Sequence, residues 1–341
     1  MFVKPLTFDL LRVLTDGEFH SGEKLACELG VSRASIRQAV QPLDRIGVTL
    51  NAVRGRGYRI REKLDWLDPA YLHRKTKRCG IDLQFVDSID STNRELLRRL
   101  HDGRAAHGSV LAAEWQSGGR GRFERRWQAA VAQGLMFSLA WRFATSAGFL
   151  AGLSLAIGVA LVRALRAFGC MDAGLKWPND VLIRKHKLAG ILIELSGDAL
   201  GPGTAIIGVG LNVVLPDKIK ARIGQPAADL THLAPGDSPA PSRNPLFARL
   251  LDELVDVLDR FEKRGFPAFR EEWQRMHAFQ NQTVRLDLPG KRVETGVALG
   301  VTAQGALRLR TATGEKHFHS GELYAAPNCM SLGSAPGCSD R

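Results

Sequence analysis

Residues 116–127 of this chain read Gln-Ser-Gly-Gly-Arg-Gly-Arg-Phe-Glu-Arg-Arg-Trp. Segments typical of β-strands stand on either side, at residues 109–115 and 134–143. Glycines let a backbone approach a ligand closely and adopt positive φ, and arginines present several fixed donors to carboxylate and phosphate oxygens. We therefore interpret the segment as an anion-binding loop between two strands. From these residues alone, a flexible basic surface loop or an RNA-binding tract is an alternative interpretation.

Two further motifs follow, Lys-Trp-Pro-Asn-Asp at residues 176–180 and Lys-Leu-Ala-Gly-Ile at residues 187–191. With Gly-Arg-Gly-Arg at 119–122, Trp127, and Asp-Ser-Thr-Asn at 90–93, they resemble the biotin–protein ligase family. The resemblance spans roughly residues 10–323, and the combination is specific although each motif alone is not. An N-terminal helix-turn-helix pattern makes the chain most similar to the bifunctional ligases that also repress biotin synthesis genes.

Composition supports a multidomain protein with polyanionic partners. The 341 residues suggest two or three domains, and 45% apolar residues suffice for a core. A net charge of +12 favours nucleic acid or nucleotide. Five scattered cysteines without a Cys-x-x-Cys pair argue against a metal site and favour a reducing cytoplasm. No signal peptide is evident, and the apolar run at 147–162 is too short to span a membrane.

The N-terminal residues predict a winged helix-turn-helix. Helical spacing occurs at 6–14, 21–29 and 33–46, and Ser32 is suited to cap the third helix. Ile36, Val40 and Leu43 would face the core, and we expect Pro42 to bend or break the helix near Gln41. A two-stranded wing follows at 51–60. The candidate DNA contacts are Arg33, Ser35, Arg37, Gln38, Arg54 and Arg56. A protein-binding module with solvated arginines is the alternative.

After an exposed helical connector at 61–80, we expect a strand at 81–86 and a helix at 94–101. Thr92 and Glu95 have the spacing of a capping box, so the hydroxyls before this helix could serve only as caps. The resemblance implies instead that this segment contacts the ureido ring of biotin. It assigns that contact to Ser91, Thr92, Asn93 and Gln116.

The resemblance also implies that the loop at 118–127 folds over an adenylate, with Arg120, Gly121 and Arg122 near the carboxyl–phosphate linkage and Trp127 near the nucleotide. The family pattern has glycine where this chain has Glu124. That change adds a negative charge and removes a flexible hinge. The glutamate at this position therefore affects how the loop closes and how well it retains the adenylate intermediate.

Successive central strands are expected at 175–184, 187–196 and 204–215. Pro178 should bend the chain and present Lys176, Asn179 and Asp180 at the edge of the sheet. Lys187 could be a solvated turn lysine, but the resemblance places it on the carboxylate and the α-phosphate. The same resemblance packs Gly208 and Gly210 on biotin and puts Asn212 near ATP and Mg²⁺. A β-bulge at the glycines is the alternative.

We expect the strand at 134–143 to be half-buried, a core helix at 150–168, a surface excursion at 216–245 and an amphipathic helix at 246–264. The predicted fold class is α+β multidomain. It comprises a winged helix-turn-helix at 1–62, a class II synthetase-like mixed α/β domain at 63–277, a small SH3-like barrel at 278–326 and a disordered tail at 327–341.

The function expected from the resemblance is ATP-dependent formation of biotinyl-5′-AMP and transfer of biotin to a lysine of biotin carboxyl carrier protein. The candidate catalytic residues are Lys187, Arg120, Asp180 and Lys176, with Asn212 or Asp180 helping to hold Mg²⁺. No Walker A motif occurs. Operator DNA is the second partner, and an adenylate-bound homodimer in the cytoplasm is implied. The alternatives are a biotinyl-AMP-sensing transcription factor with weak ligase activity, or a lipoate ligase relative.

Overall fold

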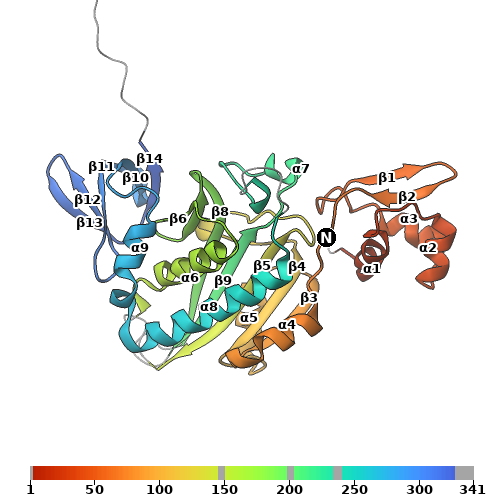
Figure 1. Ribbon diagram of the computed structural model, residues 1–341, viewed down its shortest axis with the longest axis horizontal. Coiled ribbons are helices and arrows are strands. Elements are labelled where there is room, and N and C mark those ends of the chain that lie inside the picture. Colours follow the sequence, from red (N-terminus) through yellow and green to blue (C-terminus); the bar gives the residue numbers. More distant parts are fainter. Residues whose placement is uncertain (1–2, 145–149, 198–202, 233–239, 327–341) are drawn as a thin grey trace, which may run out of the picture.

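The computed structural model describes residues 3–144, 150–197, 203–232 and 240–326, so the predicted tail at 327–341 lies outside the described residues. The N-terminal unit, the sheet-containing unit and the small C-terminal unit follow one another along the long axis (Figure 1). The N-terminal unit contains α1 (Pro5–Leu14), α2 (Gly22–Glu28), α3 (Arg33–Ala39), β1 (Leu50–Val53) and β2 (Gly57–Ile60). Helix, turn, helix and a two-stranded wing therefore form as predicted.

The third helix is shorter than predicted. It ends at Ala39, with Val40 as its C-cap, instead of continuing to residue 46. Pro42 lacks an N–H and its ring crowds the preceding turn, so regular α-helix stops close to the expected break near Gln41. Isolated turns then carry the chain to Gly47, and Leu43 is still buried in the core of this unit.

The connector leads into a seven-stranded mixed sheet. Its helix α4 (Pro69–Thr76) is largely exposed, as predicted, and is followed by the short η1 (Lys77–Cys79). Leu72 anchors α4 in the main core beside the long helix α8 (Arg243–Arg264). The strand order is β3-β4-β5-β9-β8-β7-β6, and only β3 and β4 are parallel neighbours. The strands are β3 (Asp82–Ile89), β4 (Ser109–Gln116), β5 (Gly134–Phe143), β6 (Ala173–Lys176), β7 (Asp180–Ile183), β8 (His186–Gly197) and β9 (Gly203–Asn212).

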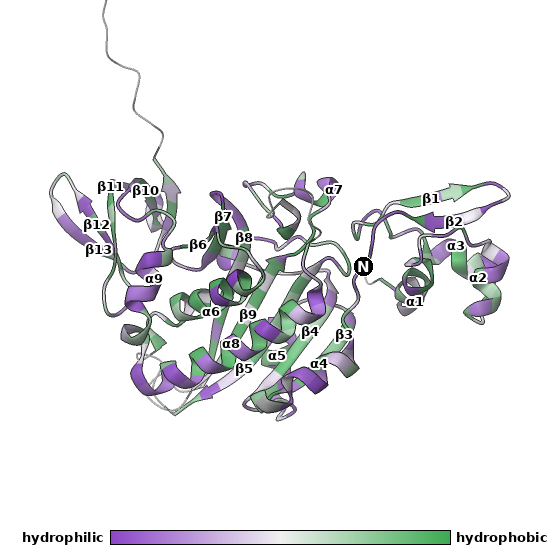
Figure 2. Ribbon diagram, viewed as in Figure 1, coloured by the Kyte–Doolittle hydropathy of each residue, from purple (hydrophilic) through white to green (hydrophobic). Residues whose placement is uncertain are grey.

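Helices cover both faces of this sheet, and the strands between them are strongly hydrophobic (Figure 2). Helix α5 (Thr92–His101) packs on one face through Leu96 against Leu111 and Ile206. The other face meets α6 (Leu153–Ala167) and α8. The prediction of a half-buried β5 was therefore wrong, since residues on both of its faces are buried. Among the described residues, no helix has the length and apolarity needed to cross a membrane.

Two local predictions near the site also need correction. Ser91, not Thr92, is the N-cap of α5, because the Ser91 hydroxyl accepts from the backbone N–H of Arg94. Glu95 pairs with Arg98 and Arg99, so the two residues form no capping box. The single strand predicted at 175–184 is a hairpin of β6 and β7, and the chain turns at the cis Trp177–Pro178 bond.

The remaining elements join the sheet to the C-terminal unit. They are α7 (Asp217–Lys220), η4 (Leu230–His232), α8, which begins three residues before the predicted residue 246, η5 (Phe266–Ala268) and α9 (Arg270–Met276). The C-terminal unit is the small β domain expected, a five-stranded antiparallel sheet ordered β13-β12-β11-β10-β14. Its elements are β10 (Thr283–Leu288), η6 (Pro289–Lys291), β11 (Arg292–Val301), β12 (Leu307–Thr311), β13 (Gly314–Phe318) and β14 (Glu322–Ala325).

The winged unit is docked on the sheet-containing unit by packing and by charge. Trp115, Val131 and Ala132 belong to the same buried cluster as the winged-unit residues Phe8, Leu43 and Ile46. The backbone N–H of Val131 donates to Ile46 O at 3.0 Å, and Arg12 pairs with Asp87. Residues just after the arginine-rich loop thus form part of the base on which the winged unit rests.

Candidate active site

One cavity lies where the loop at 118–127, the start of α5, and strands β8 and β9 meet the turn between β6 and β7. Fourteen of the fifteen residues predicted for ligand binding or catalysis line it. They are Ser91, Thr92, Asn93, Gln116, Arg120, Gly121, Arg122, Trp127, Lys176, Asn179, Asp180, Lys187, Gly208 and Gly210. The fold therefore gathers groups from five separated stretches of the chain into a single space.

Neutral polar groups occupy one end of the cavity. Thr92 N donates to Gln116 Oε1 at 2.8 Å, and Ser138 Oγ lies 2.7 Å from Thr92 Oγ1 and 2.5 Å from Asn93 Oδ1. Asn93 Nδ2 donates to Glu194 Oε2 at 2.8 Å and to Leu192 O at 3.3 Å. Every amide group of Asn93 is therefore engaged by protein, which fixes the side chain in one orientation.

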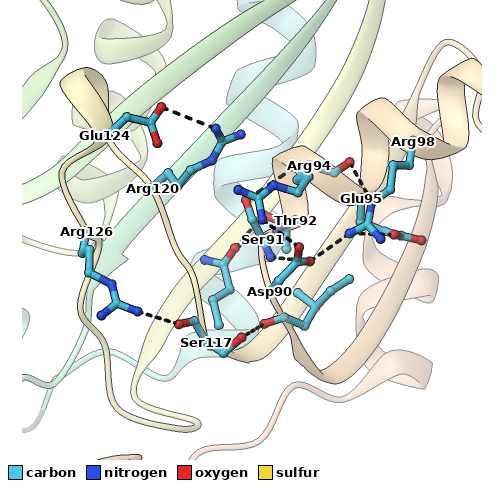
Figure 3. Close-up of polar contacts among 12 residues, drawn as sticks. Asp90, Ser91, Thr92, Arg94, Glu95, Arg98, Ser117, Arg120, Glu124 and Arg126 are labelled. Carbon is cyan, nitrogen blue, oxygen red and sulfur yellow. Dashed lines mark hydrogen bonds and ion pairs between the residues drawn. The ribbon is translucent and has the colours of Figure 1, made fainter. Parts of the chain in front are cut away.

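A charged cluster holds the start of α5 from outside this end (Figure 3). Asp90 accepts from Arg94 Nη1 at 3.1 Å and from Arg98 Nη2 at 2.9 Å, and it caps the backbone N–H of Ser91. These three donors keep the pKa of Asp90 below its ordinary value, although desolvation opposes them. The Ser91–Asn93 turn is thus held in place by protein contacts alone.

Positive groups gather at the opposite end. Lys187 Nζ lies 2.7 Å from Asp180 Oδ1, and Lys176 Nζ lies 3.8 Å from Asp180 Oδ2. Burial lowers the pKa of Lys176, and the Asp180 carboxylate partly opposes that effect. Burial likewise lowers the pKa of the Arg122 guanidinium. Two carboxylates, Asp180 and Glu322, line the cavity together with a larger number of partly desolvated cations, which leaves this end suited to an anionic ligand.

The arginine-rich loop forms a short hairpin. Trp127 N donates to Gly119 O at 2.9 Å and Gly121 N donates to Arg125 O at 2.7 Å. At its tip, Phe123 and Glu124 both have positive φ, 55° and 54°. A left-handed backbone conformation costs a non-glycine residue about 1 kcal/mol or more. The glycine that the family pattern has at position 124 would adopt this conformation without that cost.

Both edges of the loop are held by other parts of the protein. Arg125 pairs with Glu322 of β14, and Arg122 Nη1 donates to Gly321 O and Asn179 Oδ1, each at 3.4 Å. The loop that closes the cavity therefore rests on the C-terminal unit. Glu322 itself lines the cavity.

The glycines of β9 make room for protein side chains. A Cβ on Gly208 would lie 2.2 Å from Asn93 Oδ1, and one on Gly210 would lie 2.5 Å from the Trp127 indole. The registers of β9 with β5 and β8 run without a shift through both glycines, so the β-bulge alternative was wrong.

Asn212 is the one predicted ligand-binding residue outside the main cavity. Its amide donates to Ala228 O at 3.0 Å, and the residue lines a second, smaller hollow with Gln128, Ile223 and Ala227. Trp127 and Lys187 border both spaces, so the indole over Gly210 forms a partition between them.

The candidate DNA contacts lie on the winged unit, away from the cavity. Arg33, Arg37 and Gln38 are exposed on α3. Ser35 is half-buried, and both its backbone N–H and its hydroxyl contact the Ser32 hydroxyl. Arg54 and Arg56 are exposed in the wing. The Arg56 guanidinium stacks over Phe19 at 4.3 Å from the ring centre, which holds it near the base of the wing.

Several residues of the cavity and its surroundings were missed from the sequence: Ser138, Glu194, Glu322 and Gln225. Ser138 and Glu194 carried a signal, since each is a polar residue inside an otherwise apolar strand. Glu322 and Gln225 carried none, because they reach the cavity only through the docking of distant segments.

The fold and cavity define an acid-activating ligase with a DNA-binding domain: a mixed sheet holding neutral polar and cationic groups in one space, with a winged helix attached. Family profiles agree with each part. The Biotin/lipoate A/B protein ligase family profile matches residues 85–212, an HTH domain profile matches 7–59, and the Biotin protein ligase C terminal domain profile matches 279–324.

Among curated relatives, the "Bifunctional ligase/repressor BirA" of Salmonella typhimurium is 35% identical, covering 94% of this chain and 96% of that protein. The Escherichia coli protein of the same name is 34% identical over 92% and 95%. The solved biotin protein ligase of Aquifex aeolicus, in complex with biotin and ATP, is 28% identical with a TM-score of 0.59, covering 71% of this chain and 97% of that one. The chain therefore belongs to the biotin/lipoate protein ligase family.

Proposed function

We propose that this chain activates biotin with ATP, transfers it to a lysine of the biotin carboxyl carrier protein, and also represses transcription through its winged helix. The observation that supports the ligase function best is the convergence of Arg120, Lys176 and Lys187 on one cavity that also contains a neutral polar end. The names of the relatives, ligase and repressor together, support both activities.

The neutral end suits the head group of biotin. A ureido ring carries both donors and an acceptor. The Ser91 hydroxyl accepts the cap bond from Arg94 N and can still donate its proton, and the Gln116 amide nitrogen is also a donor. The Thr92 hydroxyl lies between Gln116 and Ser138 and would exchange one of these contacts for the ring. Asn93, whose amide is fully engaged, would hold the shape of this pocket. Biotin bound this way would point its carboxylate toward the cations.

The cationic end suits the reacting groups. A carboxylate oxygen of biotin attacks the α-phosphate of ATP, the bond to pyrophosphate breaks, and biotinyl-5′-AMP forms. Negative charge builds on phosphate oxygens in that step, and preorganised cations stabilise it. Lys187 and Arg120 would supply this stabilisation, with Arg122 and Gly121 closing over the linkage and Trp127 bordering the nucleotide.

Transfer then requires a carrier lysine to approach the anhydride. Its neutral amine attacks the acyl carbon, AMP leaves, and an amide forms. Asp180, already paired with Lys187 and near Lys176, is our candidate for orienting that amine. Asn179, which donates to Ile191 O at 2.7 Å, would fix the turn that carries Asp180.

Mg²⁺ enters with ATP and prefers oxygen ligands, chiefly phosphates and water. Asp180 is a poor candidate for holding it, because two ammonium groups already face its carboxylate. Asn212, beyond the Trp127 partition, is the better candidate if the triphosphate extends into the second hollow.

Purified protein with Mg·ATP, radiolabelled biotin and a carrier domain tests the ligase proposal. Label on the carrier lysine supports it. Label trapped as adenylate without transfer would favour a sensing factor, and transfer of lipoate but not biotin would favour a lipoate ligase. Operator binding as an adenylate-dependent homodimer in the cytoplasm is the regulatory half of the proposal. Operator affinity and sedimentation, each with and without biotin and ATP, test that half.

A further inference from the structure

A carboxylate outside the set of predicted residues contacts both Arg120 and Asn93. Glu194 lies on β8, and its side chain is 27% exposed. Its Oε1 accepts from Arg120 Nη2 at 3.1 Å, and its Oε2 accepts from Asn93 Nδ2 at 2.8 Å. The two oxygens therefore engage one cationic group and one amide that both line the cavity.

These contacts form a continuous series of hydrogen bonds. The series runs from Gln116 to Thr92, Ser138, Asn93, Glu194 and Arg120. Gln116 and Arg120 are four residues apart in the chain, so the series holds both sides of the base of the arginine-rich loop. Because the Asn93 amide oxygen can only accept, the Ser138 proton points to it, and the amide protons must face Glu194.

The position of Arg120 depends strongly on its hydrogen bond to Glu194. Its Nε is buried and lacks a hydrogen-bond partner in the described part of the chain. Its other carboxylate neighbour, Glu124, lies 3.7 Å away on a side chain that is 83% exposed. Without Glu194, the carboxylate left to pair with the guanidinium within the described ranges is the solvent-facing Glu124, so we expect the guanidinium to lose its fixed position against β8.

We infer that Glu194 is the positioning residue that aims Arg120 at the acyl-phosphate and keeps Asn93 in the shape that receives the head group. This inference rests on the proposed role of Arg120 in adenylate formation. It makes Glu194 a residue that touches no substrate but sets two groups that line the substrate cavity. A preorganised cation stabilises developing charge far better than a mobile one.

The two halves of this role can be separated by substitution. Glu194→Gln keeps one acceptor for Asn93 but removes the charge that holds Arg120. We expect kcat for adenylate formation to fall about tenfold with the KM for biotin nearly unchanged. Glu194→Ala removes both acceptors, and the KM for biotin should rise as well. Glu194→Asp keeps the charge and should recover part of the lost kcat.

The decisive measurement is a double-mutant cycle with Arg120→Ala, following pyrophosphate release in single turnovers, with thermal melting to confirm folding. Glu95→Gln is the matched control, because Glu95 also forms ion pairs with two arginines but lies outside the cavity. Glu194→Gln should cause no further loss of adenylation rate in the Arg120→Ala background. If the two losses multiply, or Glu194→Gln is as fast as the wild type while Arg120→Ala is slow, the inference is wrong. Near-normal adenylation by Arg120→Ala would instead overturn the proposed role of Arg120, and the inference with it.

Discussion

In the ligase cavity the charged groups come from residues 120–122, 176–180 and 187, whereas in the winged unit the candidate contacts come from residues 33–38 and 54–56. The cavity cations are half-buried and balanced by the carboxylates of Asp180 and Glu194. The winged-unit arginines face solvent. Charge–charge interactions are stronger where water is excluded and are screened by salt where it is not.

This difference predicts two kinds of response to mutation. Removing a cation from the cavity leaves a partly desolvated carboxylate without its partner and removes charge stabilisation from the reacting groups. A single substitution should therefore reduce activity severely. Removing an exposed arginine weakens one of several additive phosphate contacts, so its effect should be graded and salt-dependent. Each region can then be disabled while the other is measured.

Lys187→Ala should give the largest effect. It removes the cation proposed to stabilise the transition state and leaves Asp180 without its 2.7 Å partner. Adenylate formation should fall by about 10²–10³-fold, the scale of losing one preorganised donor. Pyrophosphate release measures it, and operator affinity without ligand should be unchanged. Lys185→Ala, in the exposed turn before β8, is the control; near-normal turnover by Lys187→Ala would remove Lys187 from the site.

Arg33→Ala combined with Arg37→Ala is the converse change. Both side chains are exposed on α3, and neither has a resolved structural role in the core. Operator affinity should weaken by roughly 10–100-fold, and the slope of log affinity against log salt should become shallower by about two. Biotin ligation should remain at the wild-type rate. Unchanged DNA affinity would mean that the winged unit binds something else.

The same difference explains how much the sequence could predict. The winged unit was predicted almost element by element, because helical spacing, the N-caps Ser21 and Ser32, and the break at Pro42 are local signals. Fourteen cavity residues followed from motifs tied to a family resemblance, not from local physics. Ser91 displaced Thr92 as the cap because the extended backbone of Ser91 is what a cap requires, and spacing alone does not reveal it.

Contacts between residues far apart in the chain could not be predicted from the sequence. Gly208, Gly210 and Asn212 alternate with the period of a strand and so share one face of β9. Trp127 nevertheless lies over Gly210 and separates Asn212 from the main cavity. Glu194 stands out as a polar residue in an apolar strand, but its contacts with Asn93 and Arg120, about 100 and 74 residues earlier, are seen only in the fold.

The docking surface between the two regions offers a third test. Gly47 has φ +88°, and a Cβ there would lie 2.6 Å from the Cβ of Ala130, three residues after Trp127. Gly47→Ala should therefore destabilise the protein by about 2 kcal/mol and loosen the winged unit. Gly55→Ala is the matched control, because its φ is also positive but nothing lies within 4 Å. Thermal melting and limited proteolysis of both variants measure the difference; equal losses would mean that the contact with Ala130 contributes nothing.

The smallest expected effect concerns Glu124. This residue combines features of both regions, because its own carboxylate faces solvent whereas its partner, the Arg120 guanidinium, is half-buried in the cavity. Glu124 has φ 54°, and its carboxylate lies 3.7 Å from Arg120 Nη1. Glu124→Gly removes both the unfavourable backbone and the competing charge, so dissociation of biotinyl-5′-AMP should slow by roughly two- to fivefold.

Glu124→Gln separates the two causes, because it removes the charge but keeps a side chain at positive φ. Adenylate release, followed by trapping with excess unlabelled ligand, should slow partly in Glu124→Gln and further in Glu124→Gly. If Gln matches the wild type and only Gly is slower, the backbone at the loop tip controls retention. If Gln and Gly are equally slow, the charge beside Arg120 controls it. Release at the wild-type rate in both variants would show that residue 124 has no influence on the cavity.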